Sequence, residues 1–246
     1  MGNKARIEIL HEEEAFVVIN KPAGLLSIPD RFDQGLPNAK HILREQYGEI
    51  LTVHRLDRDT SGVLCFARMA EAHSHLSTQF ADHQPKKIYW ALVSGTPILE
   101  EGSIDTALTE DLRRPGRMTT TVKGGLNALT HYRVIEKFAD YSLLEVQIET
   151  GRTHQIRVHL QSIGHALVAD PFYSRQSSFL LSSVKGRKYR LGKNKEERPL
   201  LSRTALHAHS LEFIHPVSGA TLQFEAELPK DMRATLQQLG KWNALH

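Results

Sequence analysis

The sequence predicts an α+β fold, and two observations support this prediction. Short apolar runs with strand character alternate with segments of helical period, and their order is irregular rather than a repeated strand–helix unit. The composition, 40% hydrophobic and 24% charged over 246 residues, is that of an ordinary globular protein with a substantial core. Because we find no internal repeat and no clear linker, we expect a single domain over residues 1–246.

The first half of the chain contains most of the clear signals. A run of β-branched and aromatic residues closed by Lys21-Pro22 predicts a strand at 16–20, and Gly48 and Gly95 end two later elements. Residues 25–38 are expected to form a loop, since they contain two prolines and a glycine. The expected elements are strands at 50–54, 63–67 and 88–93 and helices at 39–47 and 69–80.

In the second half, polar and apolar residues alternate over 141–148, which predicts a half-buried strand paired with one at 129–135. Thr153 is expected to cap a helix that ends at Gly164, with Ile156, Leu160 and Ile163 facing the core. The sequence of residues 100–127 predicts a loop and a short hairpin. The remaining expectations are an exposed Ser-rich and basic insertion at 174–201, strands at 204–213 and 221–228, and a closing helix with Met232, Leu236 and Leu239 inward.

Charge and cysteine content restrict the setting in which the protein works. A net charge of +3 and a pI of about 8.9 permit a nucleic-acid partner without requiring one. The single cysteine, Cys65, excludes a disulfide within the chain and suits a reducing compartment. The N-terminal residues lack the apolar stretch of a signal peptide, and no segment has membrane-spanning length, so we expect a cytoplasmic protein that does not bind membranes.

The densest polar motif is His-Arg-Leu-Asp-Arg-Asp-Thr-Ser-Gly at residues 54–62, between two apolar runs. Two carboxylates and two guanidiniums beside a turn cost folding free energy unless they are exposed to solvent or paired with opposite charges, or unless they serve the protein's function. A second motif spans 149–160 and runs from a strand end through Gly151 into a helix N-terminus, which exposes Arg152 at the rim of a sheet. An idle polar loop and a capped helix with surface charges remain alternative interpretations of these motifs.

Together the two motifs resemble the RluA-type family of RNA pseudouridine synthases. Four further segments in the family's order support the resemblance, which spans roughly residues 8–228. These segments are Asn20–Leu25, Lys87–Gly95, Asp170–Tyr173, and Leu206–Ala208 followed by His215-Pro216.

The resemblance implies an isomerase with a bent, mostly antiparallel sheet and a central cleft. Such enzymes detach uracil from its ribose in RNA and reattach it through carbon, without metal or cofactor. Asp57 matches the indispensable carboxylate, Arg152 the arginine that pairs with it, and Tyr89 the active-site tyrosine. Whether Asp57 attacks the sugar, attacks the base or abstracts a sugar proton stays open.

Other positions are assigned to the RNA. Arg55 matches the arginine that enters the stack when the target base flips out, and Ile156 and Leu206 are candidates for the pocket wall or for plain core. Two basic clusters are candidate phosphate contacts, with solvated surface charge as the alternative. They are Arg113, Arg114, Arg117 and Lys123, and then Lys185, Arg187, Lys188, Arg190, Lys193 and Lys195, with Tyr189 as a possible base-stacking residue.

Two departures from the family pattern concern the substrate. The motifs begin close to residue 8, so we expect a compact member without the separate N-terminal RNA-binding domain, acting on transfer RNA or a ribosomal RNA stem-loop, with no obligate protein partner implied. Ala169 and Ser174 stand where the family usually has glycine.

Three competing functions remain. Asp57-Arg58-Asp59-Thr60 superficially fits an aspartate-nucleophile, Mg²⁺-dependent phosphatase, but His54 and Arg55 interrupt the apolar strand that such a motif follows. The histidine pairs His207/His209 and His154/His159 would suit a metal protein, although no cysteine set accompanies them. An RNA-binding protein without catalysis is the third, and it would have no use for Asp57.

Overall fold

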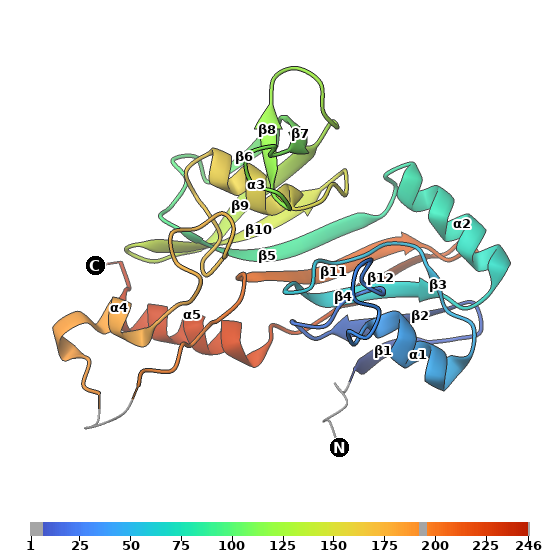
Figure 1. Ribbon diagram of the computed structural model, residues 1–246, viewed down its shortest axis with the longest axis horizontal. Helices are drawn as coiled ribbons and strands as arrows, with labels where there is room; N and C mark the ends of the chain where they lie inside the picture. Colours follow the sequence, from blue (N-terminus) through green and yellow to red (C-terminus); the bar gives the residue numbers. More distant parts are fainter. Residues whose placement is uncertain (1–6, 192–195, 246) are drawn as a thin grey trace. The chain divides into compact units, whose positions relative to one another are not determined.

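The structure is a computed structural model that describes residues 7–191 and 196–245. The chain forms two compact units, both drawn in Figure 1. Unit 1 comprises the chain up to Tyr89 together with His207–Glu227, and unit 2 comprises Trp90–Leu206 and the chain from Leu228 on. Strands β5 (Lys86–Ser94) and β11 (Leu206–Ile214) each cross a boundary and contribute to both units. A single domain over 1–246 stays a prediction.

Unit 1 contains a mostly antiparallel sheet in the order β1, β2, β4, β11. The strands are β1 (Glu8–Glu12), β2 (Phe16–Lys21), β4 (Ser61–Ala67) and β11, with β12 (Thr221–Glu225) paired to β11 and β3 (Leu51–Thr52) paired to β4. Only the pairing of β4 with β11 is parallel among the registers of this unit. Apolar residues of β2 and β4 pack with Ala72 and Leu76 of helix α2 (Ala70–Ala81), while α1 (Ala39–Tyr47) buries Ala39 and Leu43.

Unit 2 contains the strands β5, β10, β9 and β6 in that order, together with a separate two-stranded hairpin. The strands are β10 (Tyr141–Ile148), β9 (Leu129–Lys137), β6 (Glu101–Asp105), and β7 (Ala107–Glu110) with β8 (Met118–Thr121). Helix α3 (Gln155–Ser162) contacts β8, and Figure 1 shows the hairpin beside this helix. The short helices α4 (Leu181–Lys185) and η1 (Gly186–Lys188) precede the closing helix α5 (Lys230–Trp242).

The α+β class and the mostly antiparallel pairing predicted from the sequence are confirmed. Cys65 is fully buried, and burial raises the pKa of its thiol. In the part of the chain that the structure describes, no helix has both the length and the hydropathy needed to cross a lipid bilayer.

Three expectations were wrong in detail. Thr153 does not cap α3: the residue before the helix is His154, which has φ +56° and makes no side-chain capping bond. Ile163 is 37% exposed, because α3 ends before it and buries Val158 and His159 instead. The segment 174–201 is not wholly exposed, since Phe179 and Leu201 pair through their backbones and lie in the core of unit 2.

Candidate active site

Asp57 lies in a tight turn that leads into β4. The preceding residue Leu56 is buried, and its backbone exchanges hydrogen bonds with the Ser27 hydroxyl, which accepts from the Leu56 N–H (3.0 Å) and donates to its carbonyl (2.8 Å). The Thr60 N–H donates to the Asp57 carbonyl at 3.2 Å. These hydrogen bonds fix the backbone that carries the Asp57 carboxylate. Asp57 itself is half-buried.

A buried lysine braces this turn from the neighbouring strand. Lys21 is fully buried at the end of β2, and its Nζ donates to the carbonyls of Pro22 (3.0 Å), Leu25 (2.8 Å) and Arg58 (3.0 Å). The Gly24 N–H also donates to the Arg58 carbonyl at 2.9 Å. The segment Asn20–Leu25 therefore fixes the residue that follows Asp57. The family resemblance includes this segment but assigns no role to Lys21, although a lysine directly after a predicted buried strand is a signal of such a role.

The strand after the turn interlocks with β11. Ser61 and Gly62 begin β4 and pair in parallel with His207 and Ala208. The Ser61 hydroxyl donates to Nδ1 of the fully buried His207, whose Nε2 donates to the Ala226 carbonyl, each at 3.0 Å. Gly62 has φ +115°, and a Cβ there would lie 2.1 Å from the Ala208 carbonyl oxygen. Only glycine fits at this position, and this close contact supports the turn that carries Asp57.

Tyr89 shares the electrostatic environment of Asp57. The ring is buried on β5, and burial together with the negative charge of Asp57 raises the pKa of the Tyr89 hydroxyl well above its usual value. The hydroxyl therefore stays protonated at neutral pH and can donate a hydrogen bond. The charge of Asp57 thus acts on Tyr89, while the catalytic roles of both residues stay predictions.

His54 fixes the other side of the turn as a neutral ring. It stacks on Phe80 with centroids 4.5 Å apart, and its Nε2 accepts the Cys65 N–H at 3.0 Å. Burial, with a smaller contribution from the charge of Lys87, lowers the pKa of His54 to about 3. At neutral pH this histidine is a structural acceptor with no charge.

Arg152 is positioned in unit 2 by a buried glutamine. Its backbone N–H donates to Gln155 Oε1 at 3.0 Å and its Nε donates to the Asn127 carbonyl at 3.1 Å. Gln155 in turn donates to the Leu129 carbonyl and to the Thr130 hydroxyl, which ties the start of α3 to β9. Arg152 thus has an ordered backbone and side chain, while its pairing with Asp57 stays a prediction.

A family model described as RNA pseudouridylate synthase matches residues 15–162 of the chain. The chain belongs to this family. It is 39% identical over 248 residues to "Ribosomal large subunit pseudouridine synthase D" of Zymomonas mobilis, and 40% identical over 238 residues to the protein of the same description from Nitrosomonas europaea. Each match covers 95% of the chain, and 73% and 65% of these relatives respectively.

Two solved structures of human proteins have the same fold. "RNA Pseudouridylate Synthase Domain Containing 4" matches with a TM-score of 0.71 and 24% identity, over 94% of the chain and 92% of that structure. "RNA Pseudouridylate Synthase Domain Containing 1" matches with a TM-score of 0.67 and 23% identity, over 100% and 99%. The predicted family, fold class and enzyme class are confirmed: the chain is an RNA pseudouridine synthase, an isomerase whose substrate is RNA.

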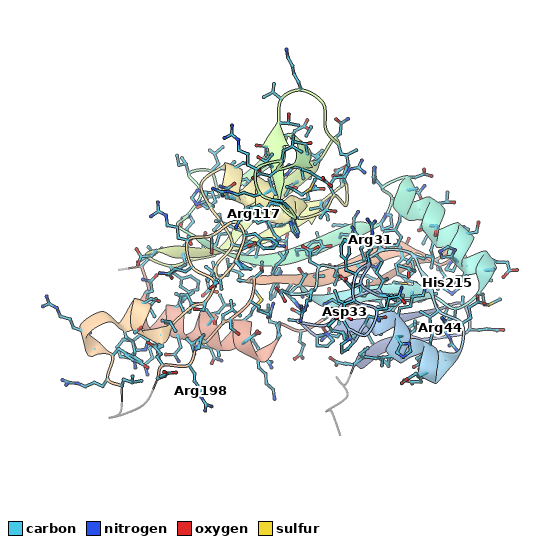
Figure 2. All side chains as sticks on the ribbon, in the orientation of Figure 1. Arg31, Asp33, Arg44, Arg117, Arg198 and His215 are labelled. Carbon is cyan, nitrogen blue, oxygen red and sulfur yellow. The ribbon has the colours of Figure 1, made fainter. Side chains whose placement is uncertain are left out.

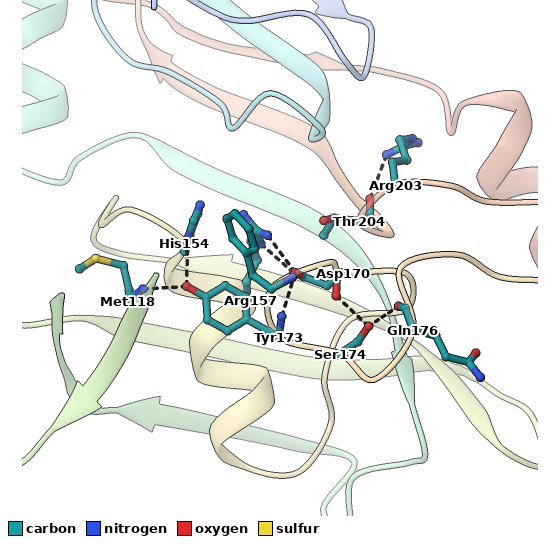
Figure 3. Close-up of polar contacts among 10 residues, drawn as sticks. Met118, His154, Arg157, Asp170, Tyr173, Ser174, Gln176, Arg203 and Thr204 are labelled. Carbon is teal, nitrogen blue, oxygen red and sulfur yellow. Dashed lines mark hydrogen bonds and ion pairs between the residues drawn. The ribbon is translucent and has the colours of Figure 1, made fainter. Parts of the chain in front are cut away.

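One further family segment of this pseudouridine synthase is explained by a buried ion pair (Figure 3). Arg157 of the second motif donates to both carboxylate oxygens of Asp170, at 2.7 and 2.9 Å, and both side chains are buried. Asp170 also accepts the N–H groups of Phe172 (2.9 Å) and Tyr173 (3.1 Å). The Tyr173 hydroxyl accepts the Met118 N–H at 2.8 Å and bonds Nδ1 of His154 at 2.9 Å. The Asp-Pro-Phe-Tyr segment therefore locks α3 to the β7–β8 hairpin.

The remaining candidates have varied surroundings. Ile156 and Leu206 are each 4% exposed, which fits a pocket wall and plain core equally, and Arg55 is exposed. Arg113, Arg114, Arg187 and Arg190 are exposed, Arg117 is half-buried, and Lys185 and Lys188 lie 4.5 and 5.8 Å from the centroid of the Trp242 ring. Lys193 and Lys195 lie outside the described residues. Tyr189 is half-buried, and a hydrogen bond ties its hydroxyl to Glu197.

The alternative of a metal protein gains no support from the histidine pair. Nδ1 of His209 and Nε2 of His207 both bond the Ala226 carbonyl, at 3.1 and 3.0 Å. Over residues 7–191 and 196–245, no group of three or more histidine, cysteine or acidic side chains is placed to hold a metal ion.

Proposed function

We propose that the chain isomerises specific uridines of structured ribosomal RNA to pseudouridine, with Asp57 as the essential carboxylate. The observation that supports this most strongly is the fixed turn at Asp57 with a protonated Tyr89 in its field. A carboxylate can open the glycosidic bond covalently or by proton abstraction, and a neutral phenol beside it can donate a hydrogen bond to the uracil during the reaction. Ribosomal RNA is favoured because two relatives are described as ribosomal large subunit enzymes.

The experiment that tests this proposal compares two classes of RNA. The purified chain is incubated with unmodified large-subunit ribosomal RNA and with unmodified transfer RNA, both transcribed in vitro, and pseudouridine is mapped by carbodiimide-dependent reverse-transcription stops. We expect stops at few ribosomal positions and none in transfer RNA. Stops only in transfer RNA would contradict the assignment of substrate, and stops in neither would contradict the function. A ribosomal RNA substrate goes with a cytoplasmic location.

Arg152 and Arg55 complete the proposed site. Arg152 is proposed to pair with Asp57 and keep the carboxylate ionised in a water-poor site, because desolvation alone would disfavour its charge. Arg55 is proposed to fill the vacated stack when the target uridine flips out, at a cost of a few kcal/mol for unstacking. Arg55 is exposed beside the buried Leu56, which leaves its guanidinium in contact with solvent on the anchored turn.

The basic residues of segment 185–190 are proposed to contact RNA phosphates. Together with Lys241, at 5.4 Å, the ammonium groups of Lys185 and Lys188 surround the Trp242 ring, so cation–π contacts hold three positive charges near one another. Arg187 and Arg190 extend this positive surface. Phosphate contacts of this kind make RNA binding fall steeply with salt.

A further inference from the structure

A cavity of about 800 Å³ opens in unit 2 beside the turn of the β7–β8 hairpin. Its lining includes Asp111, Arg114, Arg117, Phe172, Tyr173 and Arg175. Asp57, Tyr89 and Arg152 are not among the lining residues, so the cavity is not the catalytic site described above. Its volume is in the range of pockets that hold a ligand of nucleotide size.

The cavity has an excess of positive charge. Three guanidiniums and one carboxylate, that of Asp111, line it, and within the described residues none of the three arginines forms an ion pair with a carboxylate. Oδ1 of Asp111 accepts the backbone N–H of Arg113 at 3.0 Å. The three positive charges repel one another in the empty cavity. An anion that binds there relieves this repulsion, so the cavity favours anionic ligands.

The walls of the cavity are fixed before any ligand binds. The Arg117 guanidinium, labelled in Figure 2, lies 5.3 Å from the centroid of the Phe172 ring. Phe172 and Tyr173 are held by the Asp170 carboxylate, and the Ser174 hydroxyl donates to the Asp170 carbonyl at 2.8 Å (Figure 3). Arg175 follows directly, so its backbone starts from an anchored turn. A preorganised site loses less entropy on binding.

The chemistry of these groups identifies the ligand. Guanidinium forks match phosphate oxygens in two-point hydrogen bonds, and the 39% exposed Phe172 offers an aromatic edge beside them. We propose that this cavity binds a second nucleotide of the substrate RNA, other than the uridine that is isomerised, and that Arg114, Arg117 and Arg175 contact its phosphates. The proposal rests on the proposed function, since it takes RNA as the substrate, and it adds Arg175, which sequence reasoning did not single out.

The test measures the Kd for in vitro transcribed large-subunit ribosomal RNA by filter binding over a range of salt concentrations. We expect Arg114→Ala, Arg117→Ala and Arg175→Ala each to raise Kd about tenfold, and to lower the slope of log K against log salt by about 0.7–0.9 for each phosphate that is no longer neutralised. Arg113→Ala is the matched comparison, because Arg113 lies in the same turn but not in the cavity lining, and a smaller loss of affinity is expected. Arg44→Ala, on the exposed side of α1, controls for net charge.

Thermal melting of each variant shows whether it is folded, and Arg117→Lys keeps the charge at 117 if the alanine variant is unstable. A wild-type Kd and slope for Arg175→Ala, or equal losses of affinity for Arg113→Ala and Arg114→Ala, would overturn the proposal. Calorimetric titration with inorganic phosphate separates the two sources of the anion, and millimolar or tighter binding of phosphate alone would also overturn it. In each of these cases pseudouridine formation by the wild-type chain would leave the proposed function standing. Absence of pseudouridine would reject the function instead.

Discussion

Replacing Lys21 by methionine removes the brace of the Asp57 turn while keeping the volume of the side chain. The substitution deletes three hydrogen bonds of 2.8–3.0 Å from a fully buried ammonium, to the carbonyls of Pro22, Leu25 and Arg58. Hydrogen bonds to charged groups contribute about 1.5–3 kcal/mol each. Relief of the desolvation of the ammonium offsets several kcal/mol of that sum. In the variant, the Arg58 carbonyl still accepts a hydrogen bond from the Gly24 N–H.

The net expected loss of stability is roughly 2–4 kcal/mol, which corresponds to a fall in Tm of about 5–15 °C for a chain of this size. Activity should fall further than stability, because the loss of one tether allows the Asp57 backbone to shift, and a misplacement of about 1 Å can cost about 100-fold in rate. The assay is single-turnover pseudouridine formation at a temperature where melting curves show both proteins folded. Lys86→Met, at an exposed position of β5, is the matched control. A Tm within about 2 °C of wild type together with a wild-type rate would refute the bracing role of Lys21.

Three further predictions concern the same site. His54, whose pKa is depressed to about 3 in the folded chain against about 6.5 when unfolded, stays neutral while the unfolded chain takes up a proton. Its contribution to stability is therefore present above pH 6.5 and is lost as pH falls toward 3, by up to about 1.4 kcal/mol per pH unit. Urea melts at several pH values should show that His54→Gln removes that part of the dependence of stability on pH, and His41→Gln, exposed on α1, is the control substitution. Arg152→Ala should lower both Tm and turnover, since the half-buried Asp57 would lose its proposed partner; near-normal values of both would exclude the pairing with Asp57. Arg55→Ala should slow turnover on folded RNA more than on an unstructured strand, and equal losses on the two would argue against the base-flipping role.

Core strands and well-bounded helices could be predicted from the sequence. Continuous apolar runs gave β2 and β4 to within two residues, alternation gave β10 at Tyr141–Ile148, and a glycine stop gave α1 at Ala39–Tyr47. Strands β1 and β6 were not anticipated. Each is the last strand in the strand order of its unit and pairs with a single neighbour, so its sequence need not be strongly apolar. Glu101–Asp105 has almost no apolar content.

For the candidate site, the sequence could nominate Asp57 and Tyr89 because the motifs that contain them are local. The structure shows that the charge of Asp57 acts on Tyr89, while their catalytic roles stay predictions. Lys21 and Arg175 could not, because burial of an ammonium among carbonyls and the lining of a cavity depend on segments far apart in the sequence. Ile163 shows the reverse: helical spacing placed it in the core, but α3 ends at Ser162 and leaves it at the surface.

The central claim, that Asp57 carries the isomerisation, is tested most directly by tritium release from RNA labelled on the uracil ring carbon that becomes the new glycosidic attachment. Wild type should release tritium from ribosomal RNA, and Asp59→Asn, which alters the other carboxylate of the turn, should retain measurable release. Asp57→Asn should release none above the background without enzyme, while it still binds the RNA. Tritium release by Asp57→Asn at the wild-type rate would contradict the account.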